Sequence, residues 1–255
     1  MNDTLAIKLD NVSKTFRIRD KKRQSLPSVV RSLATGTFMR RIEAVKNVSL
    51  EVKKGEFLGI VGANGSGKST LLHLISGVYK PDPGGSANIY GSFMRLSLGM
   101  GFNQELTARE NIYVNASIMG LTFREIGRKF DKIIRFAELE EFIDTKIKYY
   151  SRGMRARLGF AVAIHSNPEI LLLDEIFGGV GDEKFREKSE RVFKKKLLEG
   201  RTIVLVSHNL STIKEHAERV MLMDKGKCLK IGTPEEVFLY YKEVLHVREL
   251  KLDSR

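Results

Sequence analysis

The sequence predicts an α/β fold in which helices cover both faces of a mostly parallel sheet, and three apolar runs support this. Residues 57–61, 170–173 and 202–206 carry almost no polar side chains, as expected of strands buried on both faces. A stretch with helical spacing, 184–198, separates the last two runs, which favours right-handed crossovers and a doubly wound sheet. A hairpin over 220–231 closes it. The 255 residues, 42% of them hydrophobic, are enough to fill such a core.

Alternation of apolar and polar residues predicts further, antiparallel strands near the amino terminus. Residues 5–9 and 12–18 are expected to form two half-buried strands joined by a turn at Asp10 and Asn11. Alternation resumes over 44–52. These segments together predict a second, antiparallel sheet.

Residues 19–42 are an insertion within this antiparallel unit. Basic residues bracket a short apolar stretch that contains Val29, Val30, Leu33, Phe38 and Met39. A solvated loop is one interpretation, because runs of charge are usually exposed surface. We expect instead that the segment contacts a protein or membrane partner, since several apolar residues exposed together favour one.

The loop that follows the first apolar run matches the phosphate-binding pattern G-x-x-x-x-G-K-[S/T]. Glycines allow backbone N–H groups to approach a polyphosphate, and the helix that begins here directs its positive end at the anion. Lys68 adds a charge at the β- and γ-phosphates, and Ser69 offers a hydroxyl to Mg²⁺. The predicted nucleotide-binding residues of this loop are Gly62, Asn64, Gly65, Ser66, Gly67, Lys68, Ser69 and Thr70.

Two carboxylates and a histidine follow the other two apolar runs. Asp174 and Glu175 end the second run, so both emerge at the carboxyl edge of the sheet, where open α/β folds bind ligands. We expect Asp174 to hold Mg²⁺ and Glu175 to orient or deprotonate the attacking water, although the pair could simply cap the next segment. His208 comes two residues after the third run and is a candidate contact to the γ-phosphate, whereas a lone histidine is more often structural.

Composition limits the partners without choosing one. The formal charge of +13 leaves nucleic acid, an anionic membrane surface and phosphate ligands open. The single cysteine, Cys228, excludes an internal disulfide and suits a reducing cytoplasm. There is no signal-peptide pattern and no apolar stretch long enough to span a bilayer, so we expect that the chain neither crosses a membrane nor is secreted.

A helical region over 107–167 contains the sequence Tyr149-Tyr150-Ser151-Arg152-Gly153-Met154. Ser151 precedes Asp174 by 23 residues (174 − 151). In the order and spacing of its motifs the chain resembles the ATP-binding-cassette (ABC) family, whose signature Leu-Ser-Gly-Gly-Gln stands at a similar distance before the magnesium aspartate. Arg152 and Met154 depart from that signature.

The resemblance implies roles for residues outside the phosphate loop. Ser151 and Gly153 would present a hydroxyl and open backbone, at a helix N-terminus, to the γ-phosphate of ATP held by the opposite subunit. Phe16 stands where the family places an aromatic ring that stacks on adenine, with a core aromatic as the alternative. Gln104 is the candidate for the family's glutamine loop, which senses the γ-phosphate and faces the membrane partner, and it is also a candidate metal contact. Asp182 is the candidate for the aspartate loop.

The resemblance also implies a division of the chain. Residues 1–92 and 168–240 would form a P-loop, RecA-like ATP-binding core with an antiparallel β subdomain. Residues 93–167 would form a helical subdomain that carries the signature, and 241–255 a tail or linker. The stretch 246–253 is compatible with a linker or with the first strand of a further, carbohydrate-binding domain.

Three local patterns, around residues 101–111, 150–160 and 179–185, look like those of ATPase subunits that export bacterial cell-surface polysaccharides such as lipid-linked O-antigen and wall teichoic acid. This likeness implies ATP and Mg²⁺ as cofactors and a homodimer that encloses two ATP molecules. It also implies an integral membrane permease, present in two copies, that moves the lipid-linked polysaccharide. The subunit would then lie at the cytoplasmic face of the bacterial inner membrane.

Other members of the family remain alternatives. Exporters of capsular polysaccharide or teichoic acid fit the same motifs. A cassette ATPase that acts on nucleic acid would suit the positive charge, but such relatives usually hold two cassettes or long coiled coils, and this chain has one phosphate loop and no sustained heptads. We therefore expect no nucleic-acid partner. An importer of a small solute would be expected to carry the regular signature and a clear glutamine loop.

Overall fold

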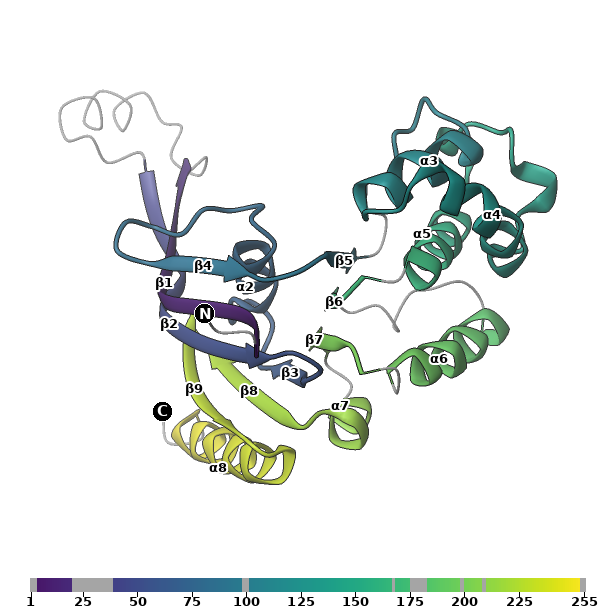
Figure 1. The fold of residues 1–255 in the computed structure, drawn as a ribbon. Coiled ribbons are helices and arrows are strands. Elements are labelled where there is room, and N and C mark those ends of the chain that lie inside the picture. Colours follow the sequence, from purple (N-terminus) through teal and green to yellow (C-terminus); the bar gives the residue numbers. More distant parts are fainter. Residues whose placement is uncertain are drawn as a thin grey trace.

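The computed structural model describes residues 4–19, 39–97, 101–166, 168–174, 183–197, 200–207 and 210–252. Within them the chain forms a three-stranded sheet, a six-stranded sheet and a helical lobe, which lies across the molecule from the three-stranded sheet (Figure 1). The predicted α/β class is confirmed.

The three-stranded sheet is antiparallel, with the order β2-β1-β4. Its strands are β1 (Leu5–Arg19), β2 (Met39–Lys53) and β4 (Ser86–Ile89). The predicted turn at Asp10 and Asn11 is wrong, because β1 runs through it as one strand. Asn11 has a φ of 50° and the pairing with β2 shifts between Leu9 and Val12, so a bulge takes up the residues that the alternation pattern assigned to a turn.

The predicted insertion is shorter than expected at both ends. Arg19 belongs to β1 and pairs with Met39 of β2, so 39–42 are strand residues as well. Residues 20–38, which hold most of the predicted partner-binding segment, lie outside the described residues. The contact of this segment with a partner therefore stays a prediction.

The six-stranded sheet has the order β5-β6-β7-β3-β8-β9, and only the β8–β9 pair is antiparallel. Its strands are β5 (Phe93–Ser97), β6 (Ile170–Asp174), β7 (Thr202–Val206), β3 (Phe57–Val61), β8 (Arg219–Asp224) and β9 (Lys227–Gly232). The three apolar runs are the interior strands β3, β6 and β7, as predicted. β5 is hydrogen-bonded into this sheet, although the sequence-based division assigned residue 93 onward to the helical part.

Helices cover both faces of the large sheet. Leucines of α2 (Lys68–Ile75) share one core with the three-stranded sheet and with β3, β6 and β7. The opposite face packs against α5 (Arg152–Ser166), α6 (Glu183–Leu197), α7 (Leu210–His216) and α8 (Pro234–Leu252). Because α8 continues to Leu252, a strand over 246–253 is wrong, and the predicted tail is helical over 241–252.

The helical lobe contains α3 (Ala108–Ile118), α4 (Phe123–Ala137), two short 3₁₀ turns, η1 (Glu140–Phe142) and η2 (Ile147–Tyr149), and most of α5. It has its own core, which includes Ile112, Ile126 and Ile133. α3 and α4 each begin with a capping box, a Thr followed three residues later by a Glu. α5 connects the two cores, since Phe160 packs toward the sheet and Leu158 toward the lobe. No described helix is both long enough and apolar enough to span a bilayer.

Candidate nucleotide-binding site

A cavity of about 370 Å³ opens at the phosphate loop, between the end of β3 and the start of α2. The loop contributes Asn64, Gly65, Gly67, Lys68, Ser69 and Thr70 to its walls. β2 and the β8–β9 turn supply the rest, namely Ile42, Glu43, Ala44, Lys46 and Lys225. Six of the eight loop residues predicted from the motif therefore line one cavity, while Gly62 and Ser66 are buried beneath it.

Glycine is required at two positions of this loop by positive φ and by close packing. Gly62 has a φ of 148°, and a Cβ there would collide with the carbonyl oxygen of Met223. Gly67 has a φ of 104°, and its Cβ would collide with the carbonyl oxygen of Ala44. The loop thus lies directly against the backbone of β2 and β8, and its shape is fixed by tertiary packing.

Lys68 is the first residue of α2, and its ammonium lies inside the loop. Nζ donates to the carbonyl oxygens of Gly62 at 2.8 Å and Ala63 at 3.0 Å, and the residue is buried. The ammonium and the N-terminus of α2 together form an anion site of the phosphate-loop type.

Ser69 and Asp174 meet at the carboxyl edge of the sheet. The Ser69 hydroxyl donates to Oδ1 of Asp174 at 3.3 Å, which joins the phosphate loop to the end of β6. A hydroxyl and a carboxylate fit the few protein ligands that Mg²⁺ takes beside nucleotide phosphates and water. The described residues contain no cluster of three or more His, Cys, Asp or Glu side chains suited to a metal.

Two further basic side chains interact with Asp174. Burial lowers the pKa of the Arg95 guanidinium, and the charge of Asp174 partly opposes this change. Burial also lowers the pKa of His73 on α2, and the charge of Arg95 lowers it further. These shifts disfavour the protonated form of His73 and leave the Arg95 guanidinium as a charged neighbour of this carboxylate.

Phe16 lies on the β1–β2 ribbon next to the cavity. It pairs with Ile42, whose side chain lines the cavity wall. Its ring contacts the Tyr79 ring edge-on, with centroids 5.2 Å apart, and the Lys14 ammonium lies 5.9 Å from its centroid. The ring is half-buried, which suits either a core aromatic or a surface for a base.

The predicted signature residues, Ser151 and Gly153, lie in the helical lobe and are not among the residues that line this cavity. Ser151 is exposed and caps α5, since its hydroxyl accepts from the backbone N–H of Met154 at 3.1 Å. Gly153 is half-buried in the first turn. One chain therefore does not bring Ser151 and Gly153 to its own phosphate loop.

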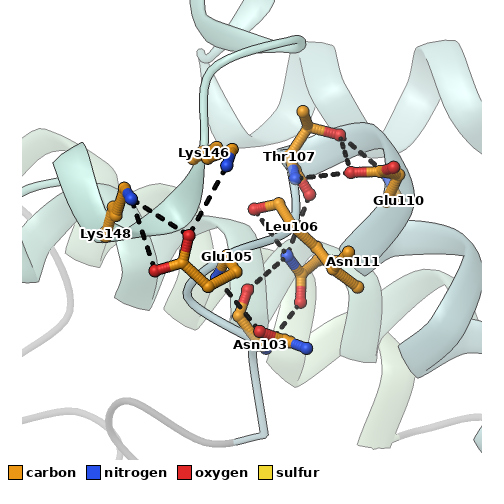
Figure 2. A network of polar contacts seen from close by, with 8 residues as sticks. All are labelled: Asn103, Glu105, Leu106, Thr107, Glu110, Asn111, Lys146 and Lys148. Atoms are coloured by element: carbon orange, nitrogen blue, oxygen red, sulfur yellow. Dashed lines mark hydrogen bonds and ion pairs between the residues drawn. The ribbon is translucent and has the colours of Figure 1, made fainter.

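Gln104 lies in an exposed loop between β5 and α3, and its backbone carbonyl accepts from the N–H of Lys148 at 3.1 Å (Figure 2 shows this region). The structure does not bring Gln104 to Asp174 in a described contact. Glu175, Asp182 and His208 lie outside the described residues, so their predicted roles remain predictions.

Sequence reasoning missed the cavity residues that come from outside the loop. Lys46 and Lys225 line the cavity together with Ala44 and Glu43, and the Lys46 ammonium pairs with the Glu43 carboxylate at 3.2 Å. These positions meet because the Lys46 N–H donates to the Gly226 carbonyl at 2.8 Å and the Gly226 N–H to the Ser66 carbonyl at 2.9 Å. No local pattern signals this contact, since the pairing is between segments distant in sequence.

Comparison with known proteins decides the family. Residues 45–178 match the family model described as ABC transporter. The chain belongs to the ABC transporter family. That span includes the phosphate loop, Ser151 and Asp174, so the predicted family is confirmed, and the subunit is an ATP hydrolase of the ABC type.

Similar ABC proteins include three export ATPases. The chain is 44% identical over 82% of its length to the O-antigen export system ATP-binding protein RfbB of Myxococcus xanthus and spans 47% of that protein. It is 43% identical over 81% of its length to the protein of the same name from Klebsiella pneumoniae, of which it spans 83%. It is 42% identical over 78% of its length to the teichoic acids export ATP-binding protein TagH of Lactococcus lactis and spans 42% of it.

A solved structure supports the same fold. The ATP-binding cassette MJ0796, in a dimeric post-hydrolysis state bound to ADP and Pi, matches with a TM-score of 0.70 and 26% identity. The match covers 89% of this chain and 98% of the cassette. The ABC cassette fold thus holds for nearly the whole described chain.

Proposed function

We propose that this ABC subunit powers the export of a lipid-linked cell-surface polysaccharide of the O-antigen type. The observation that carries the proposal is the similarity, at 42–44% identity over about four fifths of the chain, to export ATPases whose names specify O-antigen and teichoic acids. The cassette MJ0796, which has a similar fold, is much less similar in sequence to this chain, at 26% identity.

In this proposal each chain supplies one half of a nucleotide site. The phosphate loop and the N-terminus of α2 bind the triphosphate of ATP, with Lys68 beside the β- and γ-phosphates. Ser69 and Asp174 are the residues that would hold Mg²⁺, which supplies charge neutralisation at the phosphates when bound. Glu175 orients the attacking water and accepts its proton, and His208 contacts the γ-phosphate.

The second half of the site comes from another copy of the chain. Ser151 and Gly153 lie at the exposed N-terminus of α5, away from the cavity of their own chain, and are available to a partner. The solved cassette of similar fold is dimeric by its title. We therefore propose a homodimer with two ATP molecules, in which Asp182 and Gln104 adjoin the shared sites.

The proposed receiver of the force is an integral membrane permease in two copies, with the ATPase at the cytoplasmic face of the inner membrane. We propose that the ATPase contacts this permease through the end of its helical lobe, where large apolar side chains are exposed. Val114, Ile118 and Phe123 are 44%, 79% and 70% exposed. Apolar side chains exposed together in this way support a protein contact.

A variant in the bacterium that carries the gene tests this function. Replacing the chromosomal copy by Lys68→Ala should remove the surface polysaccharide and leave lipid-linked polymer inside the cell, because synthesis continues without export. Chemical analysis of the retained polymer then separates O-antigen from the alternatives, teichoic acid and capsule. Normal surface polysaccharide in this strain contradicts the proposal. A salt-sensitive affinity for nucleic acid equal to that for the permease would favour the nucleic-acid alternative.

A further inference from the structure

One buried amide determines the shape of the loop 103–107, which leads directly into α3. Nδ2 of Asn111 carries two hydrogens and lies within hydrogen-bond distance of three carbonyl oxygens, those of Asn103 at 3.0 Å, Leu106 at 3.2 Å and Thr107 at 2.9 Å, so one N–H is shared between two of them (Figure 2). Its Oδ1 accepts from the Asn103 N–H at 2.9 Å. Asn111 is fully buried, so its amide depends on these loop groups for its hydrogen bonds, although the loop itself is partly exposed. The loop therefore closes around a single side chain.

The same loop is hydrogen-bonded through its backbone to the segment that leads into the signature. The Lys148 N–H donates to the Gln104 carbonyl at 3.1 Å, and the Ile147 N–H donates to the Leu106 carbonyl at 3.0 Å. Ser151 follows Lys148 by three residues. A change in the shape of the loop therefore reaches the signature through a very short stretch of chain.

Ion pairs join the same two segments at the surface. Glu105 contacts the Lys148 ammonium at 3.0 Å and the Lys146 ammonium at 3.5 Å (Figure 2). All three side chains are at least one-third exposed, so water and salt screen the attraction. We therefore expect the buried amide of Asn111, and not these ion pairs, to hold the loop in place against the segment 147–151.

The stretch between Lys148 and Ser151 is itself held firmly. Tyr150 is buried, and its hydroxyl donates to the Phe142 carbonyl at 2.6 Å. The Ser151 hydroxyl then accepts from the Met154 N–H at the start of α5. Ser151 thus has little freedom to move independently of the segment before it.

We propose that Asn111 is a positioning residue for ATP hydrolysis, because its buried amide fixes the loop 103–107 against the segment 147–151 and so sets the position of the signature Ser151. This inference rests on the proposed function, in which Ser151 contacts ATP held by the other copy. Its consequence is that the exposed loop around Gln104 and the signature move as one unit.

Two substitutions and a matched control test the proposal. Asn111→Ala removes the amide, whereas Asn111→Asp keeps the shape and the acceptor but sets an oxygen against three carbonyls. Asn115→Ala is the control: Asn115 is the same residue type on the same helix, is also buried, and donates to the Asn111 carbonyl at 2.9 Å rather than to the loop.

Hydrogen exchange distinguishes the proposed role from a purely local role in α3, because a local role would leave exchange in the segment 147–151 unchanged. In both Asn111 variants the amides of Ile147 and Lys148 should exchange about tenfold faster or more, because their acceptors lie in the released loop. In Asn115→Ala they should exchange at the wild-type rate. Wild-type exchange of these two amides in both Asn111 variants contradicts the proposal.

The functional arm measures ATP hydrolysis as a function of protein concentration. If Ser151 is misplaced, two copies associate more weakly around ATP. The Asn111 variants should then need about tenfold more protein to reach half of their full specific activity. Binding of a fluorescent ATP analogue to the phosphate loop should stay at the wild-type level and shows that each variant is folded. Equal midpoints for the Asn111 variants and Asn115→Ala overturn the inference.

Ser151→Arg separates this inference from the proposed function. If Ser151→Arg hydrolyses ATP normally at every protein concentration, the shared-site function itself is wrong. If Ser151→Arg is inactive while both Asn111 variants behave like the control, only the role of Asn111 is wrong.

Discussion

The two halves of the proposed ATP site are built in different ways. The phosphate-loop half lines an open cavity but is packed on the main core, where Lys68 is buried and bonds to loop carbonyls and Gly67 lies against the backbone of Ala44. The signature half is at the surface of the helical lobe, where Ser151 is exposed and Tyr149 is 72% exposed. One half is therefore fixed by tertiary packing, and the other depends on a loop network and on a second copy. Changes in the first half should abolish binding or chemistry, and changes in the second should weaken assembly.

The largest effect is expected from Glu175→Gln. The amide cannot accept a proton from water, while the contacts to phosphate and Mg²⁺ stay, so turnover should fall about 10²–10⁴-fold with ATP affinity retained. ATP should then hold the dimer together, which gel filtration with and without ATP detects. Turnover at the wild-type rate would remove Glu175 from the mechanism.

Substitutions at two glycines of the loop test whether tertiary packing fixes the shape of the first half. Both have positive φ, but only Gly67 has a backbone oxygen in the way of a Cβ, whereas Gly65 has no atom within 4 Å. Forcing a methyl group into a packed site costs about 1–3 kcal/mol, so Gly67→Ala should weaken ATP binding about 10- to 100-fold. Gly65→Ala carries only the backbone strain and should lose clearly less. Titration with a fluorescent ATP analogue measures both, and equal losses would argue against the packing account.

A smaller effect is expected at the edge of the first half, where Phe16 adjoins the cavity. Stacking of a base on an aromatic ring contributes about 1–3 kcal/mol, so Phe16→Ala should weaken ATP binding about tenfold. Phe16→Tyr should bind ATP like the wild type, because the ring is kept. An unchanged affinity in Phe16→Ala would make this ring a core aromatic that packs on Tyr79.

Acid should loosen the second half before the first. Hydrogen bonds hold the pKa of four lobe carboxyls below their ordinary values. Outside the lobe, one carboxyl among the described residues has its pKa lowered in this way, that of Glu169 just before β6. The lobe groups and their main partners are Glu105 with Lys148, Glu110 with Thr107, Glu125 with Thr122, and Asp144 with Arg109.

Because these pKa values are lower in the folded chain, the stabilisation is complete above the ordinary glutamate value of 4.5 and is lost as the pH falls through the folded values. Hydrogen exchange, normalised to the rate of an unfolded chain, should therefore rise in α3 and α4 below about pH 4.5 before it rises in β3 or β6. This is the smallest effect, because each carboxyl is exposed. Simultaneous loosening of lobe and sheet would contradict the comparison.

The sequence predicted the first half well because its signals are local. The apolar runs of β3, β6 and β7 and the motif from Gly62 to Ser69 each lie within a few residues. The bulge at Asn11 was mistaken for a turn, because an Asn with positive φ suits both and only the pairing with β2 separates them. Lys46 and Lys225 were missed because distant segments bring them to the cavity.

For the second half, the sequence predicted the position of the signature but not the contacts that support it. The spacing of Ser151 before Asp174 predicts a signature there, and the exposure of Ser151 suits a shared site. The support of that segment by Asn111 could not be predicted, because the amide acts across 36 residues (147 − 111) through loop carbonyls. Its only local signal is its place directly after Glu110 of the capping box.

Mixed dimers test the shared site most directly. Two differently tagged copies are co-purified, with Lys68→Ala in one and Ser151→Arg in the other. If each site joins Lys68 of one copy to Ser151 of its partner, this dimer keeps one intact site and hydrolyses ATP. A dimer that carries both changes in one copy, beside a wild-type copy, should then have none and be inactive. The reverse pattern, with activity only when both changes share one copy, would place each site within a single chain and contradict the account.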